Sequence, residues 1–382
     1  MRAKKIIKQS AKIVSLIAAV ILSACVLQEF VLCNSDHNRE RIKGFDLENK
    51  NSLDVVFMGA SEVYSDLAPG YAYKNYGYTS YLYASQASSI MSYKFQLQEL
   101  LKKQNPKLIV IELNSAVYAN DENVTKEENV RNYVDNTHLS LEKVDFVNSY
   151  TEKNREEYYF PIIKYHDAWK DIGDNMGMIS TITGNRFRGY NYLKGMMNQT
   201  VVFHSSQRTM NDFLSDINDK KPLTELSEQK LRELLQFCKD NNLKNVVFAR
   251  FPHIVVRRTY DRCERSNTVE QIVSEYGFDY LNFEKNDAGI NIDYKKDFYN
   301  LDHFNVYGQK KFTDYISKLI RDKYGVTGSE LNGSLKQEWD TASVYYDAYY
   351  NYSDSLIQQN KKKELDESVV SSSEFKQYIK ES

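Results

Sequence analysis

Short apolar segments alternate with longer amphipathic segments along most of this chain, and few folds accommodate such a pattern. The short segments are rich in the β-branched and aromatic residues of buried strands, and the longer ones carry apolar residues at helical spacing. We expect strands at 54–58, 107–113, 244–250 and 278–283, and helices at 88–104, 226–242, 269–276 and 308–324. Strands separated by helices pair in parallel through right-handed crossovers. The sequence therefore predicts an α/β fold with a mostly parallel sheet between helices.

The first 33 residues have the composition of an export or anchoring segment. Basic residues come first, at Arg2, Lys4, Lys5, Lys8 and Lys12. An apolar run over 13–27 follows and resumes at 30–33. Because basic residues stay on the cytoplasmic side of a span, we predict an uncleaved single-pass signal anchor in the cell membrane, with the rest of the chain outside the cytoplasm. A second interpretation stays open: residues 22–25 resemble a lipoprotein processing site, with Cys25 lipidated.

Charge and cysteine content limit the classes of partner. The chain has 50 basic and 52 acidic residues, and no basic cluster follows the amino terminus, so no nucleic-acid partner is expected. Beyond the anchor only Cys238 and Cys263 remain, and the histidines are scattered without metal-ligand spacing. We expect no disulfide framework, no metal site and no cofactor.

A serine follows the first predicted strand on a tight turn. Residues 54–69 read DVVFMGASEVYSDLAP, and Gly59 and Ala60 remove the side-chain bulk that would hinder a sharp turn before Ser61. Open α/β sheets bind their ligands at the carboxyl ends of the strands. Ser61 is therefore the first candidate nucleophile.

A histidine precedes the last predicted helix, and we predict that it is the base for this serine. Residues 297–312 read DFYNLDHFNVYGQKKF, which places His303 in a loop. A serine nucleophile needs a base and a third group that holds the imidazole in the right tautomer. Asp302, Asp297 and Asn300 stay open as that third group, and we favour Asp302 because it is nearest to the histidine.

Three strings together resemble the SGNH/GDSL hydrolase superfamily. They are GAS at 59–61, NYG at 75–77 and the His-x-Asn-x-x-Gly string that begins at His303. The resemblance covers about residues 51–324 and implies a flavodoxin-like three-layer α/β/α sandwich. It also implies that Ser61 is the nucleophile, that His303 is the base, and that Gly77 and Asn114 are oxyanion donors beside the Ser61 N–H.

The chain departs from the superfamily pattern at two positions. Members usually carry an aspartate three residues before the histidine, where this chain has Asn300. Their Gly-x-Asn-Asp block is also missing, and Asn114 in the string IELNSAVY is the nearby asparagine. An asparagine in place of the aspartate can favour the wrong imidazole tautomer, so a Ser-His dyad or a weakened enzyme is also compatible with the sequence.

The other segments are predicted as attachments to this domain. A polar linker over 34–50 follows the anchor, and the strand–helix rhythm is lost between about 120 and 223. We expect that region to be a long insertion over one end of the sheet, and its tyrosine-rich stretches suit contact with sugar rings. Residues 325–382 form a C-terminal aromatic and charged extension that we expect to be partly disordered.

Within the superfamily, the tether and the insertion resemble the extracytoplasmic members linked to cell-wall and exopolysaccharide acylation, such as the lipoteichoic acid D-alanylation protein class. The resemblance implies a membrane-tethered serine esterase or O-acyltransferase that forms an acyl-serine, with acetyl as the expected group. Its expected substrate is a cell-surface polysaccharide or cell-wall polymer, and a membrane-bound acyltransferase is a candidate partner. The alternative is a catalytically weakened SGNH-fold module that binds glycan, a membrane acyltransferase or an export partner.

Overall fold

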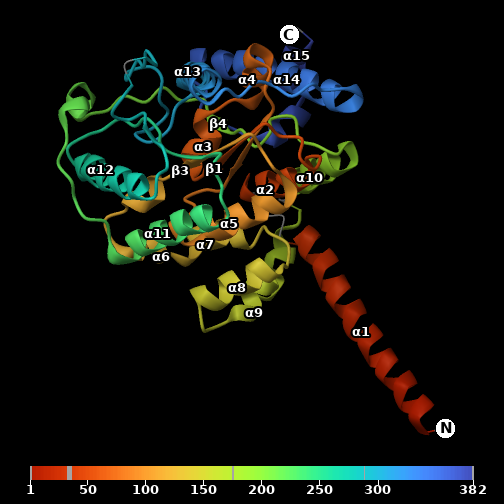
Figure 1. Ribbon diagram of the computed structural model, residues 1–382. Coiled ribbons are helices and arrows are strands. Elements are labelled where there is room, and N and C mark those ends of the chain that lie inside the picture. Colours follow the sequence, from red (N-terminus) through yellow and green to blue (C-terminus); the bar gives the residue numbers. More distant parts are fainter. Residues whose placement is uncertain (1, 32–36, 174–175, 288, 381–382) are drawn as a thin grey trace. The chain divides into compact units, whose positions relative to one another are not determined.

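The computed structural model describes residues 2–31, 37–173, 176–287 and 289–380 (Figure 1). They form two units, one of Met1–Asp36 with His138–Ser180 and one of His37–Thr137 with Thr181–Ser382. The first unit contains the long helix α1 (Arg2–Val31), and the second contains the sheet. Residues 32–36, which hold the end of the predicted anchor and the start of the predicted linker, lie outside the described residues.

A five-stranded parallel sheet forms the centre of the second unit. Its strands are β1 (Val55–Gly59), β2 (Ser80–Ala84), β3 (Leu108–Glu112), β5 (Val246–Arg250) and β6 (Tyr280–Asn282). Hydrogen bonding gives the order β2-β1-β3-β5-β6, with every neighbouring pair parallel. The predicted parallel α/β fold is confirmed, and four of the five strands lie where we expected them. Strand β2 was not predicted.

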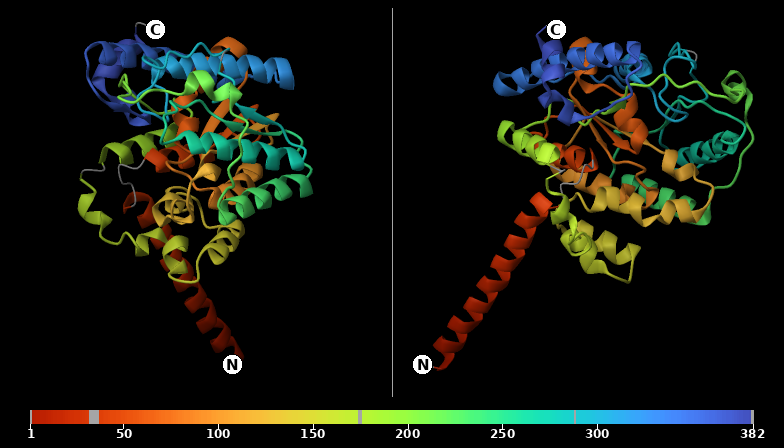
Figure 2. Two further views of the ribbon diagram at one scale, coloured as in Figure 1. Left: turned by 90° about the vertical axis from the view of Figure 1, so that its left-hand side faces the viewer. Right: turned by 180° about the vertical axis from the view of Figure 1, so that it is seen from behind.

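Helices cover both faces of this sheet (Figures 1 and 2). On one face α4 (Pro69–Tyr76), α13 (Val306–Tyr324) and α14 (Gly333–Gln358) pack together, and on the other α5 (Ile90–Lys103) contacts α11 (Glu225–Asp240). The other α-helices assigned to this unit are α2 (His37–Leu47), α3 (Ser61–Asp66), α6 (Asp121–Thr125), α7 (Glu127–Val134), α12 (Tyr260–Glu275) and α15 (Ser373–Ile379). Its short 3-10 helices are η1 (Asn114–Val117), η4 (Asn211–Asp216) and η5 (Glu367–Ser371).

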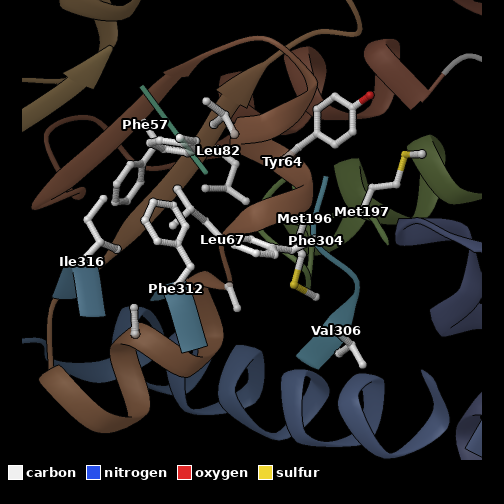
Figure 3. Close-up of a cluster of buried hydrophobic side chains, with 14 of the residues drawn as sticks. Phe57, Tyr64, Leu67, Leu82, Met196, Met197, Phe304, Val306, Phe312 and Ile316 are labelled. Carbon is white, nitrogen blue, oxygen red and sulfur yellow. The ribbon is translucent and has the colours of Figure 1, made fainter. Parts of the chain in front are cut away.

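The main core lies between the sheet and α13 (Figure 3). Phe312 of α13 is fully buried, with its ring centroid 4.8 Å from that of Phe251 and 5.1 Å from that of Phe283. The edge-to-face angles of 73° and 78° suit the quadrupoles of the rings. Since Phe251 and Phe283 each follow a strand directly, these contacts hold α13 against the carboxyl ends of β5 and β6.

Two segments that we expected to be linker or partly disordered are folded in the described residues. The stretch predicted as a polar linker forms α2, and the C-terminal extension forms α14, β7 (Glu364–Leu365), η5 and α15. Trp339, Tyr346 and Tyr349 lie on one face of α14 and are buried, which explains why this polar-looking helix packs. Strand β7 pairs antiparallel with β4 (Asn198–Gln199), which lies inside the predicted insertion.

Ion pairs join the two ends of the sheet unit. His37, the first residue of α2, lies 2.7 Å from Asp366 through Nδ1 and also pairs with Glu364 through Nε2. Although burial lowers the pKa of His37, the two carboxylates raise it to about 9. The imidazole is therefore charged at neutral pH, and both contacts are true ion pairs.

The first unit combines α1 with part of the predicted insertion. That part contains α8 (Leu141–Tyr150), α9 (Arg155–Tyr159), and the 3-10 helices η2 (Pro161–Ile163) and η3 (Ala168–Asp171), while α10 (Met176–Arg188) begins here and ends in the second unit. The stretch Ile6–Gln28 of α1 is long and apolar enough to cross a membrane. The structure thus contains one N-terminal apolar helix, which fits either a membrane anchor or a signal sequence.

Gly308 provides a test of the packing between α13 and the loop before it. A Cβ atom at this position would lie 2.5 Å from the Asp297 carbonyl oxygen and even closer to the Phe304 ring. We expect Gly308→Ala to destabilise the fold by roughly 1–3 kcal/mol because the helix would have to move away from the loop. Urea unfolding monitored by fluorescence measures this change.

Gly184 of α10 is the matched control, since a Cβ atom added there would meet nothing within 4 Å. At this position alanine should stabilise the helix by up to about 1 kcal/mol. Equal stability of Gly308→Ala and the parent chain would contradict the packing described here.

Candidate active site

The sheet order reverses between β1 and β3, and this is where the predicted nucleophile lies. From β1 the chain crosses to β2 on one side and then returns to β3 on the other, so the loops that follow β1 and β3 diverge. Ser61 begins α3 two residues after β1, and Asn114 begins η1 two residues after β3. A Cβ atom on Gly59 would lie 2.9 Å from the side chains of both Glu112 and Val63. The glycine is therefore required for the close approach of the two strand ends.

The loop that carries His303 is hydrogen-bonded to α3. The Phe304 N–H donates to Asp66 Oδ1 at 2.9 Å, and Ser65 Oγ lies 3.0 Å from Tyr299 Oη. The Tyr299 ring stacks on the His303 imidazole, with centroids 5.2 Å apart and planes 6° from parallel. The fold thus brings the predicted base to the helix that begins with the predicted nucleophile.

Asn300 fixes the tautomer of His303. Its Oδ1 accepts hydrogen bonds from the backbone N–H groups of Asp302 at 2.8 Å and of His303 at 2.9 Å. Because only the amide oxygen can accept them, the same oxygen is the atom that lies 2.9 Å from His303 Nδ1. Nδ1 must therefore carry the proton, which leaves Nε2 as the basic nitrogen.

The environment of His303 favours a neutral imidazole. Burial lowers the pKa of His303, and the nearby Glu62 carboxylate opposes this only in part. Its Nε2 atom is buried and has no hydrogen-bond partner among the described residues. A neutral imidazole with an unengaged Nε2 lone pair is the form in which histidine accepts a proton.

Asp302, our preferred third group, does not contact the His303 ring. Its Oδ1 lies 3.3 Å from Nη1 of Arg262. Asp297 is buried and pairs with Lys311 at 2.7 Å. Of the three residues that the sequence left open, Asn300 alone is placed within hydrogen-bond distance of the imidazole in the described chain. The structure therefore corrects the choice of Asp302.

Gly77, predicted as an oxyanion donor, lies at the opposite end of the strands from Ser61. It caps α4 with φ 79° and comes three residues before β2, at the amino end of the strands. Its N–H donates to the Tyr73 carbonyl at 2.8 Å. Because each strand residue adds about 3.3 Å, the full length of a strand separates Gly77 from Ser61, and Gly77 cannot act on the same carbonyl.

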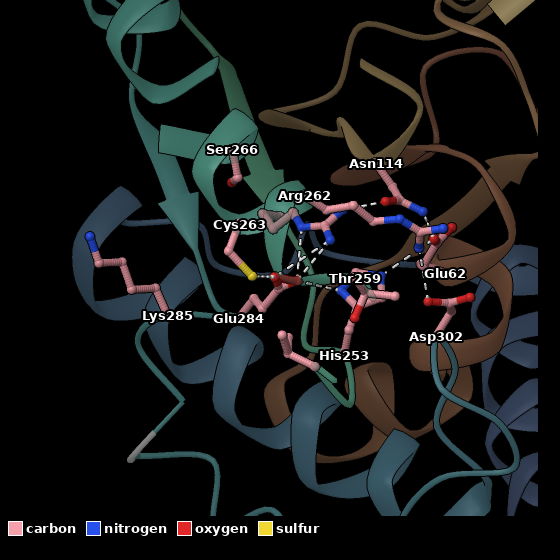
Figure 4. Close-up of polar contacts among 12 residues, drawn as sticks. Glu62, Asn114, His253, Thr259, Arg262, Cys263, Ser266, Glu284, Lys285 and Asp302 are labelled. Atoms are coloured by element: carbon pink, nitrogen blue, oxygen red, sulfur yellow. Dashed lines mark hydrogen bonds and ion pairs between the residues drawn. The ribbon is translucent and has the colours of Figure 1, made fainter. Parts of the chain in front are cut away.

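Asn114 and Glu62 point toward one another (Figure 4), and Glu62 directly follows Ser61 in the chain. The Asn114 amide group donates to Glu62 Oε1, and Ser61 Oγ donates to Glu62 Oε2 at 3.4 Å. Although burial raises the pKa of Glu62, the hydrogen bond with His253 and the nearby His303 hold it at about 2. The nucleophile candidate therefore lies next to a buried, ionised carboxylate.

Further charges continue this cluster behind Asn114. Arg250 donates to Asn114 Oδ1 and pairs with Glu284 at 2.8 Å. His253 lies between two carboxylates, with Nδ1 2.9 Å from Glu284 Oε2 and Nε2 3.5 Å from Glu62 Oε1. Despite its burial and the repulsion of Arg250, these carboxylates raise the pKa of His253 to about 9. Two buried cations thus balance two buried anions.

Glu112 adds a further buried acid to this cluster. Burial and then the neighbouring Glu62 carboxylate raise the pKa of Glu112 well above its usual range. Its Oε1 accepts a hydrogen bond from the Asn114 N–H at 2.6 Å.

Among the residues that the structure describes, no group of three or more His, Cys, Asp or Glu side chains is arranged to hold a metal ion.

Besides Glu112, which lies in the predicted strand KLIVIEL, sequence reasoning missed four members of this cluster, and each had a local signal. Glu62 directly follows the candidate serine, and Arg250 ends the predicted strand KNVVFAR. His253 comes three residues later, and Glu284 follows the strand FDYLNF. Polar residues just after predicted parallel strands all reach the same edge of a sheet, which is the pattern that could have identified them.

Comparisons with known proteins give no relative: no protein-family model, no curated protein and no solved structure matches this chain.

The charge state of His253 makes stability depend on pH. The pKa of His253 is about 9 in the folded chain and 6.5 without its partners, so its ion pairs stabilise fully below pH 6.5 and are lost as the pH rises through 9. We expect His253→Gln to cost roughly 3–5 kcal/mol near pH 6.5, because it leaves the two buried carboxylates Glu62 and Glu284 with Arg250 as the one buried cation among the described residues of the cluster. The destabilisation should become smaller as the pH approaches 9, where His253 of the parent chain has lost its charge as well.

Urea unfolding of the parent and the variant across this pH range measures the difference. The ion pairs of His37, which titrates in the same range, are present in both chains and cancel. A destabilisation that does not vary with pH would show that His253 is not charged in the folded chain.

Proposed function

We propose that this protein is a membrane-tethered serine esterase or O-acyltransferase of the SGNH type, which acts outside the cytoplasm on a cell-surface polysaccharide or cell-wall polymer. Ser61 is the proposed nucleophile, His303 the general base and Asn300 the residue that orients it. The strand order around the reversal point, the same as in flavodoxin-like sheets, supports the resemblance in fold. The apolar helix α1 supports the tether.

The proposed reaction has two steps with one covalent intermediate. Ser61 Oγ attacks the carbonyl carbon of an acyl donor, and its proton passes to His303 Nε2. The tetrahedral intermediate collapses, the C–O bond to the leaving group breaks, and His303 returns the proton to the leaving oxygen. Water or a sugar hydroxyl then attacks acyl-Ser61 by the same route, which releases the acid or the acylated glycan and restores Ser61.

The oxyanion of both steps needs hydrogen-bond donors near Ser61. We propose the Ser61 N–H, at the first position of α3, where backbone N–H groups have no acceptor within the helix. The Asn114 amide nitrogen is the second proposed donor: it carries two N–H bonds, of which the Glu62 carboxylate takes one. Each such donor is worth about 2.7–4 kcal/mol in the transition state of acyl transfer.

One observation carries this proposal: Asn300 Oδ1, held by two backbone N–H groups, presents His303 with its basic Nε2 unengaged. An asparagine in this position can hold the histidine in the wrong tautomer. Here the two backbone N–H groups fix the Asn300 oxygen, and that oxygen requires the proton to be on His303 Nδ1. An asparagine orients the catalytic histidine of papain-like proteases in a comparable arrangement.

Substitutions at two neighbouring loop residues test the assignment. Asn300→Ala should lower the rate at which a fluorophosphonate probe labels Ser61 roughly 10²–10⁴-fold, because the base loses its tautomer and position. Asn300→Asp should keep labelling, since a carboxylate can accept the same three hydrogen bonds. Asp302→Asn, the matched control, should change the rate less than about five-fold, because a partly exposed ion pair is worth at most about 1 kcal/mol.

Peptide mapping of the labelled chain identifies the modified residue, with Ser61→Ala and His303→Ala as negative controls. If Asp302→Asn abolished labelling while Asn300→Ala retained it, the third group would be Asp302 and our assignment would be wrong.

A second candidate function is a glycan-binding or partner-binding module that has lost catalysis. It is favoured by the hydrogen bond from Ser61 Oγ to Glu62, since the oxygen is not directed to His303 Nε2. Such a module would bind polysaccharide in a sedimentation assay and show no serine labelling. If cells that carry Ser61→Ala lost glycan acylation while the level of the protein stayed normal, the result would support the esterase or acyltransferase function over the binding module.

A further inference from the structure

We propose that residues 139–173 of the first unit, together with Met176, lie on the outer surface of the bilayer that α1 spans, with their apolar side chains in the headgroup region. Five large apolar side chains there are between 46% and 81% exposed: Leu139, Leu141, Ile163, Trp169 and Met176. Exposed apolar residues are common singly, but five in one short segment in contact with an apolar helix are typical of an interfacial segment. The inference requires that α1 is a membrane span and does not depend on the proposed chemistry.

The dimensions of α1 fix where the outer face of the membrane lies. Its apolar stretch Ile6–Gln28 has 23 residues. At about 1.5 Å per residue it is roughly 35 Å long, which is enough to cross a hydrocarbon core of about 30 Å. All side chains from Ile6 to Ser23 are exposed, as a lipid-facing helix requires. With its basic amino end in the cytoplasm, the span ends at the outer surface near Gln28.

The rest of the first unit is in contact with this outer end of α1. Helix η2 touches α1, and α9 in turn contacts η2 and α8. Along α1 the first partly covered side chains are Ala24 and Gln28, which lie on one face, and Gln28 Oε1 is buried. The segment therefore lies at the level where the span leaves the hydrocarbon core.

The chemistry of the segment suits the lipid interface. Trp169 is 59% exposed, and tryptophan is enriched at this depth because its ring is apolar and its N–H is polar. Residues 139–173 contain seven acidic and five basic side chains, so attraction to anionic lipids is not the basis of the contact. A neutral phosphatidylcholine bilayer is therefore the appropriate probe.

The two tryptophans of the chain make a direct test possible. Trp339 is fully buried, so Trp339→Phe leaves the emission of Trp169 alone. The full chain with this substitution is reconstituted in phosphatidylcholine nanodiscs with or without bromine on the acyl chains. Since bromine quenches on close contact, we expect about two-fold lower emission in the brominated discs if Trp169 lies at the interface.

Unchanged emission in brominated discs, together with quenching by aqueous iodide, would overturn the proposal and leave this surface to a protein partner. Leu141→Glu with Ile163→Glu, in the same background, should remove the lipid quenching; unchanged quenching would contradict the proposed role of these side chains. Phe213→Glu is the matched control, since Phe213 is 52% exposed in the second unit. Unfolding temperatures confirm that the variants fold, and fluorophosphonate labelling of Ser61 in the same discs reports on the enzyme proposal separately.

Discussion

The hydrogen bond from the Phe304 N–H to the Asp66 carboxylate joins two segments 238 residues apart, and the candidate site depends on it. Asp66 is the last residue of the helix that Ser61 begins, and Phe304 directly follows His303. Burial raises the pKa of Asp66 well above its usual range. The Asp66 side chain acts in this contact as the hydrogen-bond acceptor.

The strands and most of the long helices could be predicted because their patterns are local. KLIVIEL and KNVVFAR, for example, have the composition and length of buried strands, and both are central strands of the sheet. Strand β2 was not predicted because tyrosines also occur throughout the ten residues before SYLYA, so composition marks no boundary for a strand. The first turns of α12 were not predicted because TYDRCERSN has no apolar stripe at helical spacing.

The site could be predicted only as far as Ser61, Asn114 and the His303 loop at one edge of the sheet. The choice between Asp302 and Asn300 depends on which way adjacent loop side chains point, and a one-dimensional pattern does not contain that information. Gly77 was misplaced because the sequence does not show that β2 begins after it, which puts it at the far edge. The buried charges of Glu62 and His253 depend likewise on contacts between distant segments.

The ion pairs of His37 with Glu364 and Asp366 have a mechanical consequence. In sequence, the sheet unit begins with α2. The ion pairs of His37 join the first residue of α2 to Glu364 of strand β7 and to Asp366, which follows β7. Tension on a tethered domain acts first where the tether enters. Here it would be shared between α2 and the antiparallel pair β4–β7, and Asn198 of β4 donates a hydrogen bond to the Ser65 carbonyl of α3 at 2.9 Å. A pull transmitted through α2 therefore reaches the helix that begins with Ser61.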